Sequence, residues 1–108
     1  MISPKDKAIA EKFHFAEMLQ ALDSDLTALD GVERAEYDLD GFNDGIPYVI
    51  LLVKRDIPVA AKNYFEQRRM VLTAILKAIS SNGLERTEDM LEDHGEWWYI
   101  VTKLKEKA

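Results

Sequence analysis

The second half of this chain repeats the first, and this repeat constrains the fold more than any other feature of the sequence. Residues 31–36 read Gly-Val-Glu-Arg-Ala-Glu and residues 83–88 read Gly-Leu-Glu-Arg-Thr-Glu, so the second copy begins 52 residues after the first in a chain of 108. Each copy follows a helical pattern and precedes the pattern of a β-hairpin. The repeat predicts one domain, residues 1–108, built of two α-β-β units at about 4–54 and 56–104.

Apolar residues at spacings of three and four predict one long helix in each unit. The first helix is expected to start at 3–6, where Ser3 can cap and proline suits the first helical position, and to end at Asp30-Gly31. The second is expected to start at 56–58 and to end at Asn82-Gly83, again with glycine as the cap. The apolar stripes are Phe15, Leu19, Leu22, Leu26 and Leu29 in the first helix, and Phe65, Arg68, Leu72, Ile75, Leu76 and Ile79 in the second.

Alternating apolar and polar residues predict four strands, Val32–Asp40, Ile46–Lys54, Leu84–Glu92 and Trp97–Leu104. Turn-forming residues at 41–45 and 93–96 join them into two antiparallel hairpins. Two strand orders then fit an antiparallel sheet, 1-2-4-3 and 2-1-3-4. Strands one and three are rich in charge, which suits edge positions and favours 1-2-4-3. The expected fold class is α+β, a four-stranded antiparallel sheet with two antiparallel helices on one face.

The composition excludes several classes of protein. With 47% hydrophobic and 31% charged residues, the chain has the composition of a soluble globular protein. No apolar run approaches the roughly 20 residues that a membrane span needs. The chain has no cysteine, which excludes disulfides and thiolate metal sites and makes the cytoplasm the expected compartment. The net charge of −6 argues against nonspecific binding to duplex DNA.

The charge is distributed unevenly along the chain. Residues 54–77 hold six lysines and arginines against two acids, a net charge of +4, so the remaining residues carry −10. Arg55, Lys62 and Arg69 are therefore candidates for docking an acidic partner protein; a solvated helix face is the alternative interpretation. Arg68 lies on the apolar stripe of its helix and is expected to pair with an acid at the helix–sheet margin, while Arg69 points away and is expected to be exposed.

The two inner strands are apolar on both faces, which predicts an interface. Two helices cover one face of the sheet, and a large apolar patch on the other face is rare in a monomer. The sequence therefore predicts a homodimer, or a protein partner, on the open face; a curled sheet that the helices cover more fully is the alternative. The set assigned to this interface is Tyr48, Ile50, Leu52, Trp98 and Ile100, and the alternate set is Val49, Leu51, Val53, Tyr99 and Val101.

Few residues offer catalytic or metal-binding chemistry. His14, in the first helix, and His94, in a turn, are the two histidines, and each is interpreted as a solvated or half-buried side chain. The acids Asp38, Asp40 and Asp44 superficially resemble a calcium loop but lack oxygen ligands at the later positions of an EF-hand, so only a loose cation site remains conceivable. No nucleotide-binding or nucleophile motif is present. The sequence predicts no catalytic residues, no cofactor and no metal.

These patterns favour a non-enzymatic protein-interaction domain that acts as a homodimer, in an adaptor, chaperone-like or inhibitor role. A first alternative is a small-ligand binder or minor enzyme whose pocket, between helices and sheet, uses Arg68 and the acids near His94. A second alternative is a binder of single-stranded RNA that uses Trp98 and the basic helix, although the acidic edge strands make nucleic acid an unfavourable partner.

Overall fold

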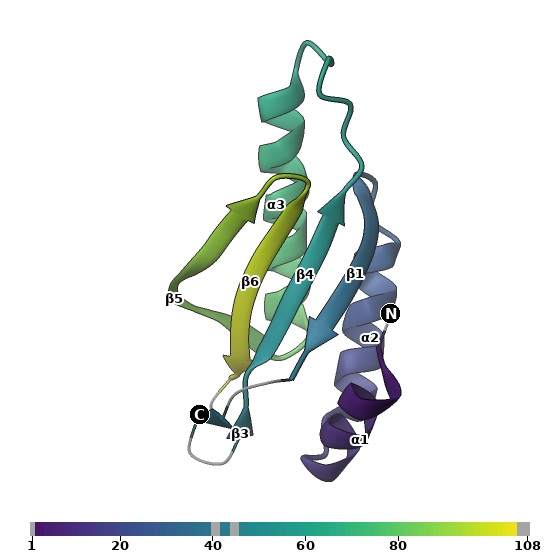
Figure 1. Cartoon of the computed structure of the whole chain (residues 1–108), viewed down its shortest axis with the longest axis vertical. Coiled ribbons are helices and arrows are strands. Elements are labelled where there is room, and N and C mark those ends of the chain that lie inside the picture. The colour runs from purple at the N-terminus through teal and green to yellow at the C-terminus, as the bar shows by residue number, and fades with distance from the viewer. Residues whose placement is uncertain (1, 40–41, 44–45, 106–108) are drawn as a thin grey trace.

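The chain folds around one four-stranded sheet, shown in the computed structural model of Figure 1, which describes residues 2–39, 42–43 and 46–105. The helices are α1 (Pro4–Lys12), α2 (Ala16–Thr27) and α3 (Tyr64–Ser81). The strands are β1 (Val32–Asp38), β2 (Phe42–Asn43), β3 (Ile46–Pro47), β4 (Val49–Arg55), β5 (Leu84–His94) and β6 (Trp97–Leu104). Within the described residues, no helix combines the length and apolarity needed to cross a membrane.

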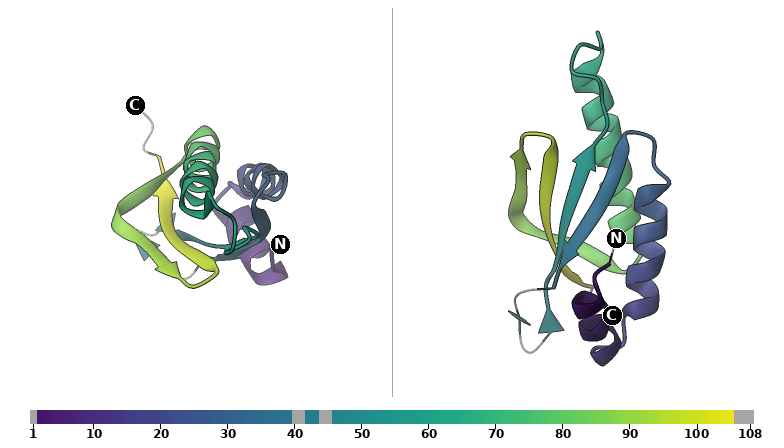
Figure 2. Two further views of the ribbon diagram at one scale, coloured as in Figure 1. Left: turned by 90° about the horizontal axis from the view of Figure 1, so that it is seen from above. Right: turned by 45° about the vertical axis from the view of Figure 1, so that its right-hand side comes forward.

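The sheet topology confirms the predicted order. The strands lie in the order β1-β4-β6-β5, and every neighbouring pair is antiparallel. In terms of the four predicted strands this order is 1-2-4-3, in an α+β fold. The charged strands β1 and β5 form the edges, and the apolar strands β4 and β6 lie between them. Figure 2 shows α2 and α3 packed on the same face of the sheet.

The first predicted helix is in fact two helices, because the chain turns at His14. The backbone of His14 has φ 63°, in the left-handed region. Its N–H donates to the Glu11 carbonyl (3.2 Å), and the Phe15 N–H donates to the Ala10 carbonyl (2.9 Å). This pair of bonds is a Schellman cap, and the buried side chains of Ala10 and Phe15 supply the apolar contact that accompanies it. The long-helix prediction failed because the apolar stripe continues through the break.

Replacing His14 with glycine is expected to stabilise the protein. Relief of left-handed strain, about 1–2 kcal/mol, exceeds the entropic cost of glycine, about 0.5–1 kcal/mol, so the free energy of unfolding should rise by roughly 0.5–1 kcal/mol. The His14 side chain is exposed, so little packing is lost. Urea denaturation measures the change, with His14→Ala as the control that keeps the strain. Equal stability of the two variants would contradict this account of the turn.

The second helix begins later than predicted. Residues 56–63 form a loop, and α3 starts at Tyr64. Turn bonds from the Ala61 N–H to the Pro58 carbonyl and from the Tyr64 N–H to the Ala61 carbonyl, both 3.1 Å, replace helical ones. Figure 1 shows this loop and the start of α3 projecting beyond the end of the sheet. A helical turn there would have no surface to pack against, and tertiary packing supplies most of a helix's stability.

Corresponding glycines open the hairpin of each unit. Gly31 has φ +89° and Gly83 has φ +84°, both left-handed. The Gly31 carbonyl accepts a bond from the Asp56 N–H (2.8 Å), and the Gly83 carbonyl accepts one from the Lys105 N–H (2.9 Å). In both units the glycine is thus bonded to the residue that follows the second strand, an arrangement that supports the predicted repeat.

The hairpin turns differ from their predicted extents. Residues 93–96 were predicted as a turn, but β5 continues to His94, which leaves a two-residue turn at Gly95 and Glu96. Gly95 has φ +66°, the conformation that such a tight turn requires. In the first hairpin, β2 pairs with β3 as a small separate ladder. Residues 40–41 and 44–45 of the predicted loop lie outside the described part of the chain.

Candidate functional site

The register of the two central strands decides which side chains face the helices. Val53 pairs with Trp98, and Leu51 pairs with Ile100. Directly paired residues of antiparallel strands lie on the same face of the sheet. Trp98 is 2% exposed and the other three are fully buried, so this is the face that α2 and α3 cover.

The predicted interface is therefore wrong in part. Trp98 and Ile100 were assigned to the open face with Tyr48, Ile50 and Leu52, but the register places them on the covered face. The error arose from matching equivalent positions of the two units, whereas the facing of a side chain depends on the register between the strands. Burial also keeps Trp98 from stacking on an RNA base, which removes the platform that the RNA-binding alternative required.

The open face carries a different apolar set. Ile50 pairs with Val101, and Leu52 pairs with Tyr99. Ile50, Leu52 and Tyr99 are half-buried, while Val101 is 5% exposed. Trp97, the first residue of β6, extends this set and is also half-buried. Figure 2 shows no described helix over this side of the sheet. The central strands thus present a partly exposed apolar strip to solvent.

Charged side chains of both signs border this strip near its end. The Lys54 Nζ lies 2.9 Å from a Glu33 carboxylate oxygen, and the Arg34 Nε lies 3.7 Å from one of Glu36. The Arg34 guanidinium and the Lys54 ammonium lie 5.2 and 6.0 Å from the centre of a Trp97 ring. Both cations are within the range of cation–π attraction. The border therefore combines acids and bases around an aromatic side chain.

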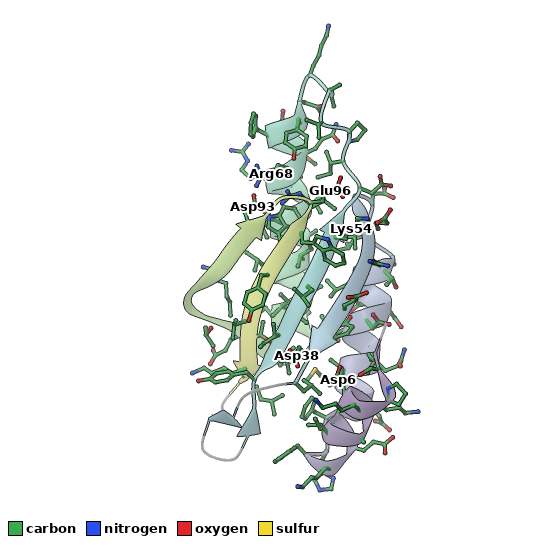
Figure 3. All side chains as sticks on the ribbon, in the orientation of Figure 1. Asp6, Asp38, Lys54, Arg68, Asp93 and Glu96 are labelled. Atoms are coloured by element: carbon green, nitrogen blue, oxygen red, sulfur yellow. The ribbon has the colours of Figure 1, made fainter. Side chains whose placement is uncertain are left out.

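A carboxylate between two arginines joins α3 to the tip of the β5–β6 hairpin. The Arg55 Nη1 donates to Asp93 Oδ1 (3.0 Å), and the Arg68 Nη2 donates to Asp93 Oδ2. The Arg55 guanidinium also lies 4.7 Å from the centre of a Trp98 ring. Figure 3 shows Arg68 and Asp93 side by side at the upper end of the sheet. We call Arg55, Asp93 and Arg68 the arginine clasp.

The clasp decides which basic residues remain available to a partner. The Arg55 side chain is only 6% exposed, so its predicted docking role is wrong: register places it on the covered face, where it pairs with Asp93. The predicted pairing of Arg68 with an acid at the helix–sheet margin is confirmed. Arg69 is exposed, as predicted, and Lys62 is exposed in the preceding loop. Lys62 and Arg69 therefore stay candidates for docking.

The described residues line several hollows. One of 490 Å³ lies between α1 and α2, and one of 400 Å³ lies between α3 and the Leu29–Gly31 turn. Another, of 230 Å³, is lined by Phe65, Arg68, Arg69, Leu72 and Trp98. Pockets for small molecules usually measure about 300–1,000 Å³. The ligand alternative required Arg68 and the hairpin acids in one pocket, and the hollow that Arg68 lines is smaller than that range.

The remaining predicted residues do not form a site that the structure describes. His14 is exposed at the α1–α2 turn. Asp38 is half-buried at the end of β1, whereas Asp40, Asp44 and the side chain of His94 lie outside the described part. Among described residues, no group of three histidine or acidic side chains is placed to hold a metal ion.

Two polar contacts that the sequence did not reveal tie the helices to β1 and to the residue that follows it. The Tyr37 hydroxyl donates to Asp23 Oδ1 (2.7 Å), and burial, reinforced by this carboxylate, raises the Tyr37 pKa far above its usual range. Asp6 is 6% exposed and accepts bonds from the Ser3 hydroxyl (2.8 Å) and the Leu39 N–H (3.3 Å). The Ser3 cap was predictable from its position before a proline, but the bond to Leu39 spans 33 residues and has no local signal.

Comparisons of this chain with protein-family models, with curated proteins and with solved structures give no match.

Proposed function

We propose that this chain is a non-enzymatic protein-interaction domain that acts as a homodimer through the open face of its sheet. The observation that carries the proposal is the apolar strip of Ile50, Leu52, Trp97 and Tyr99, half-buried on central strands that no described helix covers. Burial of apolar surface is the main driving force of association, and aromatic residues are enriched in interfaces.

The mixed charges at the edge of the strip favour a second copy of the chain as the partner. In a two-fold symmetric interface each patch meets itself, so a favourable patch must carry both signs of charge. Glu33 and Glu36 lie beside Arg34 and Lys54, which meets that condition. Four strands of 7–11 residues present a face of roughly 500 Å² at standard strand spacing and rise, below the about 800 Å² per partner of a typical interface. We therefore expect a dimer of micromolar affinity.

Sedimentation velocity tests the proposal with an acidic residue introduced into the strip. The wild type is expected to dimerise at tens of micromolar, and Leu52→Asp is expected to be monomeric at the same concentration. The buried charge should weaken the dimer by about 100-fold or more. Trp98 is unsuitable for such a substitution because its side chain belongs to the core.

The matched control is Val59→Asp, which places the same charge on an apolar residue that is 78% exposed in the loop before α3. This variant should dimerise like the wild type. Circular dichroism should show that both variants are folded. A wild type that is monomeric at tens of micromolar, or a folded Leu52→Asp variant that still dimerises, would contradict the proposal.

A further inference from the structure

The loop before α3 and the first turns of α3 carry apolar side chains that the fold leaves uncovered. Val59 is 78% exposed, Phe65 is 76% exposed and Met70 is 64% exposed. Among the side chains whose burial the structure describes, these are the large hydrophobic residues with high exposure, and they lie within twelve consecutive residues. Phe65 was predicted to face the core, but α3 projects past the end of the sheet there (Figure 1). Exposed apolar side chains are typical of interaction surfaces, and of these three Phe65 lines the 230 Å³ hollow whereas Met70 lines the 400 Å³ hollow.

Phe65 borders the 230 Å³ hollow, which we call the Phe65–Trp98 hollow. Phe65, Arg69 and Leu72 recur at helical spacing, so they line one face of α3. Trp98 of β6 also lines the hollow, and its side chain is buried between the sheet and the helices. The volume suits one or two side chains of a polypeptide better than a cofactor, because cofactor sites are larger.

Two neighbouring side chains on α3, Tyr64 and Arg68, lie against the Phe65 ring. The Tyr64 and Phe65 rings meet edge to face with centres 5.3 Å apart. The Arg68 guanidinium lies 5.8 Å from the Tyr64 ring and 6.0 Å from the Phe65 ring, while Asp93 of the arginine clasp fixes the guanidinium itself. These contacts favour one orientation of the Phe65 ring, and a side chain restricted in this way loses less entropy on binding.

The charge beside Phe65 is positive and unpaired. Arg68 is engaged with Asp93, but Arg69 has no ion-pair partner among the residues that the structure describes, and its side chain is exposed. Lys62 adds a second exposed cation in the adjoining loop. These residues belong to the segment 54–77, whose net charge is +4. An approaching carboxylate would therefore meet favourable potential at Arg69 without first displacing an internal acid.

We infer that the Phe65–Trp98 hollow binds an acidic segment of another protein, in which carboxylates flank a large apolar side chain. The apolar residue packs on Phe65 and Leu72, and a carboxylate pairs with Arg69. A second copy of this chain fits less well. If two copies met symmetrically at this hollow, the positive charges of both would face each other. If the hollow of one copy instead bound the acidic surface of another, the contact would be head-to-tail and would lead to an open-ended chain of copies. The inference is independent of the sheet-face dimer, because the hollow lies on the helical side of the sheet.

A random dodecapeptide library displayed on phage and selected against the immobilised wild-type chain tests the inference. The enriched peptides should share acidic residues around one aromatic or branched aliphatic residue. Fluorescence anisotropy with the tightest peptide should show binding that weakens at high salt. Arg69→Glu and Phe65→Ser should each lower the affinity by about tenfold or more, the effect of removing a residue central to an interface.

Two matched variants control for charge and for apolar exposure. Lys77→Glu makes the same change of charge at an exposed position near the other end of α3, and Met70→Ser removes an exposed apolar side chain that lines the 400 Å³ hollow instead. Both should bind the peptide like the wild type. The inference would be overturned if the enriched peptides share no acidic consensus. It would also be overturned if the two control variants lose as much affinity as Arg69→Glu and Phe65→Ser.

Two further outcomes would assign the hollow to a different occupant and also overturn the inference. If Arg69→Glu reduces self-association in sedimentation velocity, the hollow holds a second copy of the chain. If free citrate displaces the peptide at micromolar concentration, the hollow is a site for small carboxylates. If the chain does not dimerise through the open face of its sheet, peptide binding at the hollow should be unchanged. The experiments therefore test the two proposals independently.

Discussion

Gly31→Ala is expected to lower the free energy of unfolding by about 3 kcal/mol. Gly31 has φ +89°, and an L side chain there costs about 1–2 kcal/mol. An added Cβ would also lie 2.5 Å from Val71 Cγ2, which is closer than carbon atoms can approach. The chain at Gly31 is held by the bond from Asp56, so relief of this overlap requires either a new rotamer of Val71 or a shift of α3. Overpacking of this kind usually costs about 1–3 kcal/mol, and urea denaturation measures the total.

Gly83→Ala is the matched control, because Gly83 occupies the equivalent position of the second unit. It has φ +84°, but a Cβ there would meet no atom within 4 Å. In this variant the free energy of unfolding should therefore fall only by the cost of the left-handed backbone conformation, about 1–2 kcal/mol. In a background that already carries Val71→Ala, Gly31→Ala should cost no more than Gly83→Ala does. Equal losses for the two single alanine variants would show that the approach of Val71 has no energetic consequence.

Asp93→Ala is expected to destabilise the protein by about 2–3 kcal/mol. It removes the carboxylate of the arginine clasp and leaves Arg55, whose side chain is 6% exposed, without its acid. A hydrogen bond to a charged group contributes about 1.5–3 kcal/mol to stability. The bond between Arg68 and Asp93 contributes less than this, because both side chains are partly solvated. The start of α3 should also become less protected in hydrogen exchange, since its link to the hairpin is lost.

Glu96→Ala provides the control, because it removes an acid of the same hairpin tip. The Glu96 side chain is 75% exposed and lies 3.9 Å from Lys54, so its loss should change stability by less than about 0.5 kcal/mol. A double-mutant cycle between Asp93→Ala and Arg68→Ala then isolates the interaction of that pair. Equal effects of Asp93→Ala and Glu96→Ala would mean that the clasp does not stabilise the fold.

The strand order was predictable because it depends on charge, which is visible along each strand. Glu33, Arg34 and Glu36 mark β1 as an edge strand however it is paired. The facing of the inner strands was not predictable in the same way. Both faces of β4 are apolar, and β6 joins it without a hairpin turn that would set the register. A shift of one residue exchanges the two faces, so the pairing of Val53 with Trp98 had to come from the structure.

The candidate sites show the same division between local and distant causes. The spacing of Arg68 and Arg69 along α3 was enough to predict that one pairs and the other is exposed. Arg55 could not be placed, because its partner Asp93 is 38 residues away. The break at His14 also had no signal, since a non-glycine residue in the left-handed conformation leaves no mark on composition. The exposure of Phe65 depends on where the sheet ends, which no pattern within the helix reports.

The pairing of β4 with β6 has a consequence for how the chain folds. Each hairpin closes over a short connection, whereas the central ladder joins residues such as Val53 and Trp98 that are 45 positions apart. Loop closure becomes less favourable with length, so the two hairpins can form early and the central ladder late. Until then, each half exposes the apolar inner strand of its hairpin as an unprotected edge. The charged side chains that keep β1 and β5 from pairing with other chains do not protect β4 and β6 during that interval. Refolding at low protein concentration should therefore favour the native fold over aggregates.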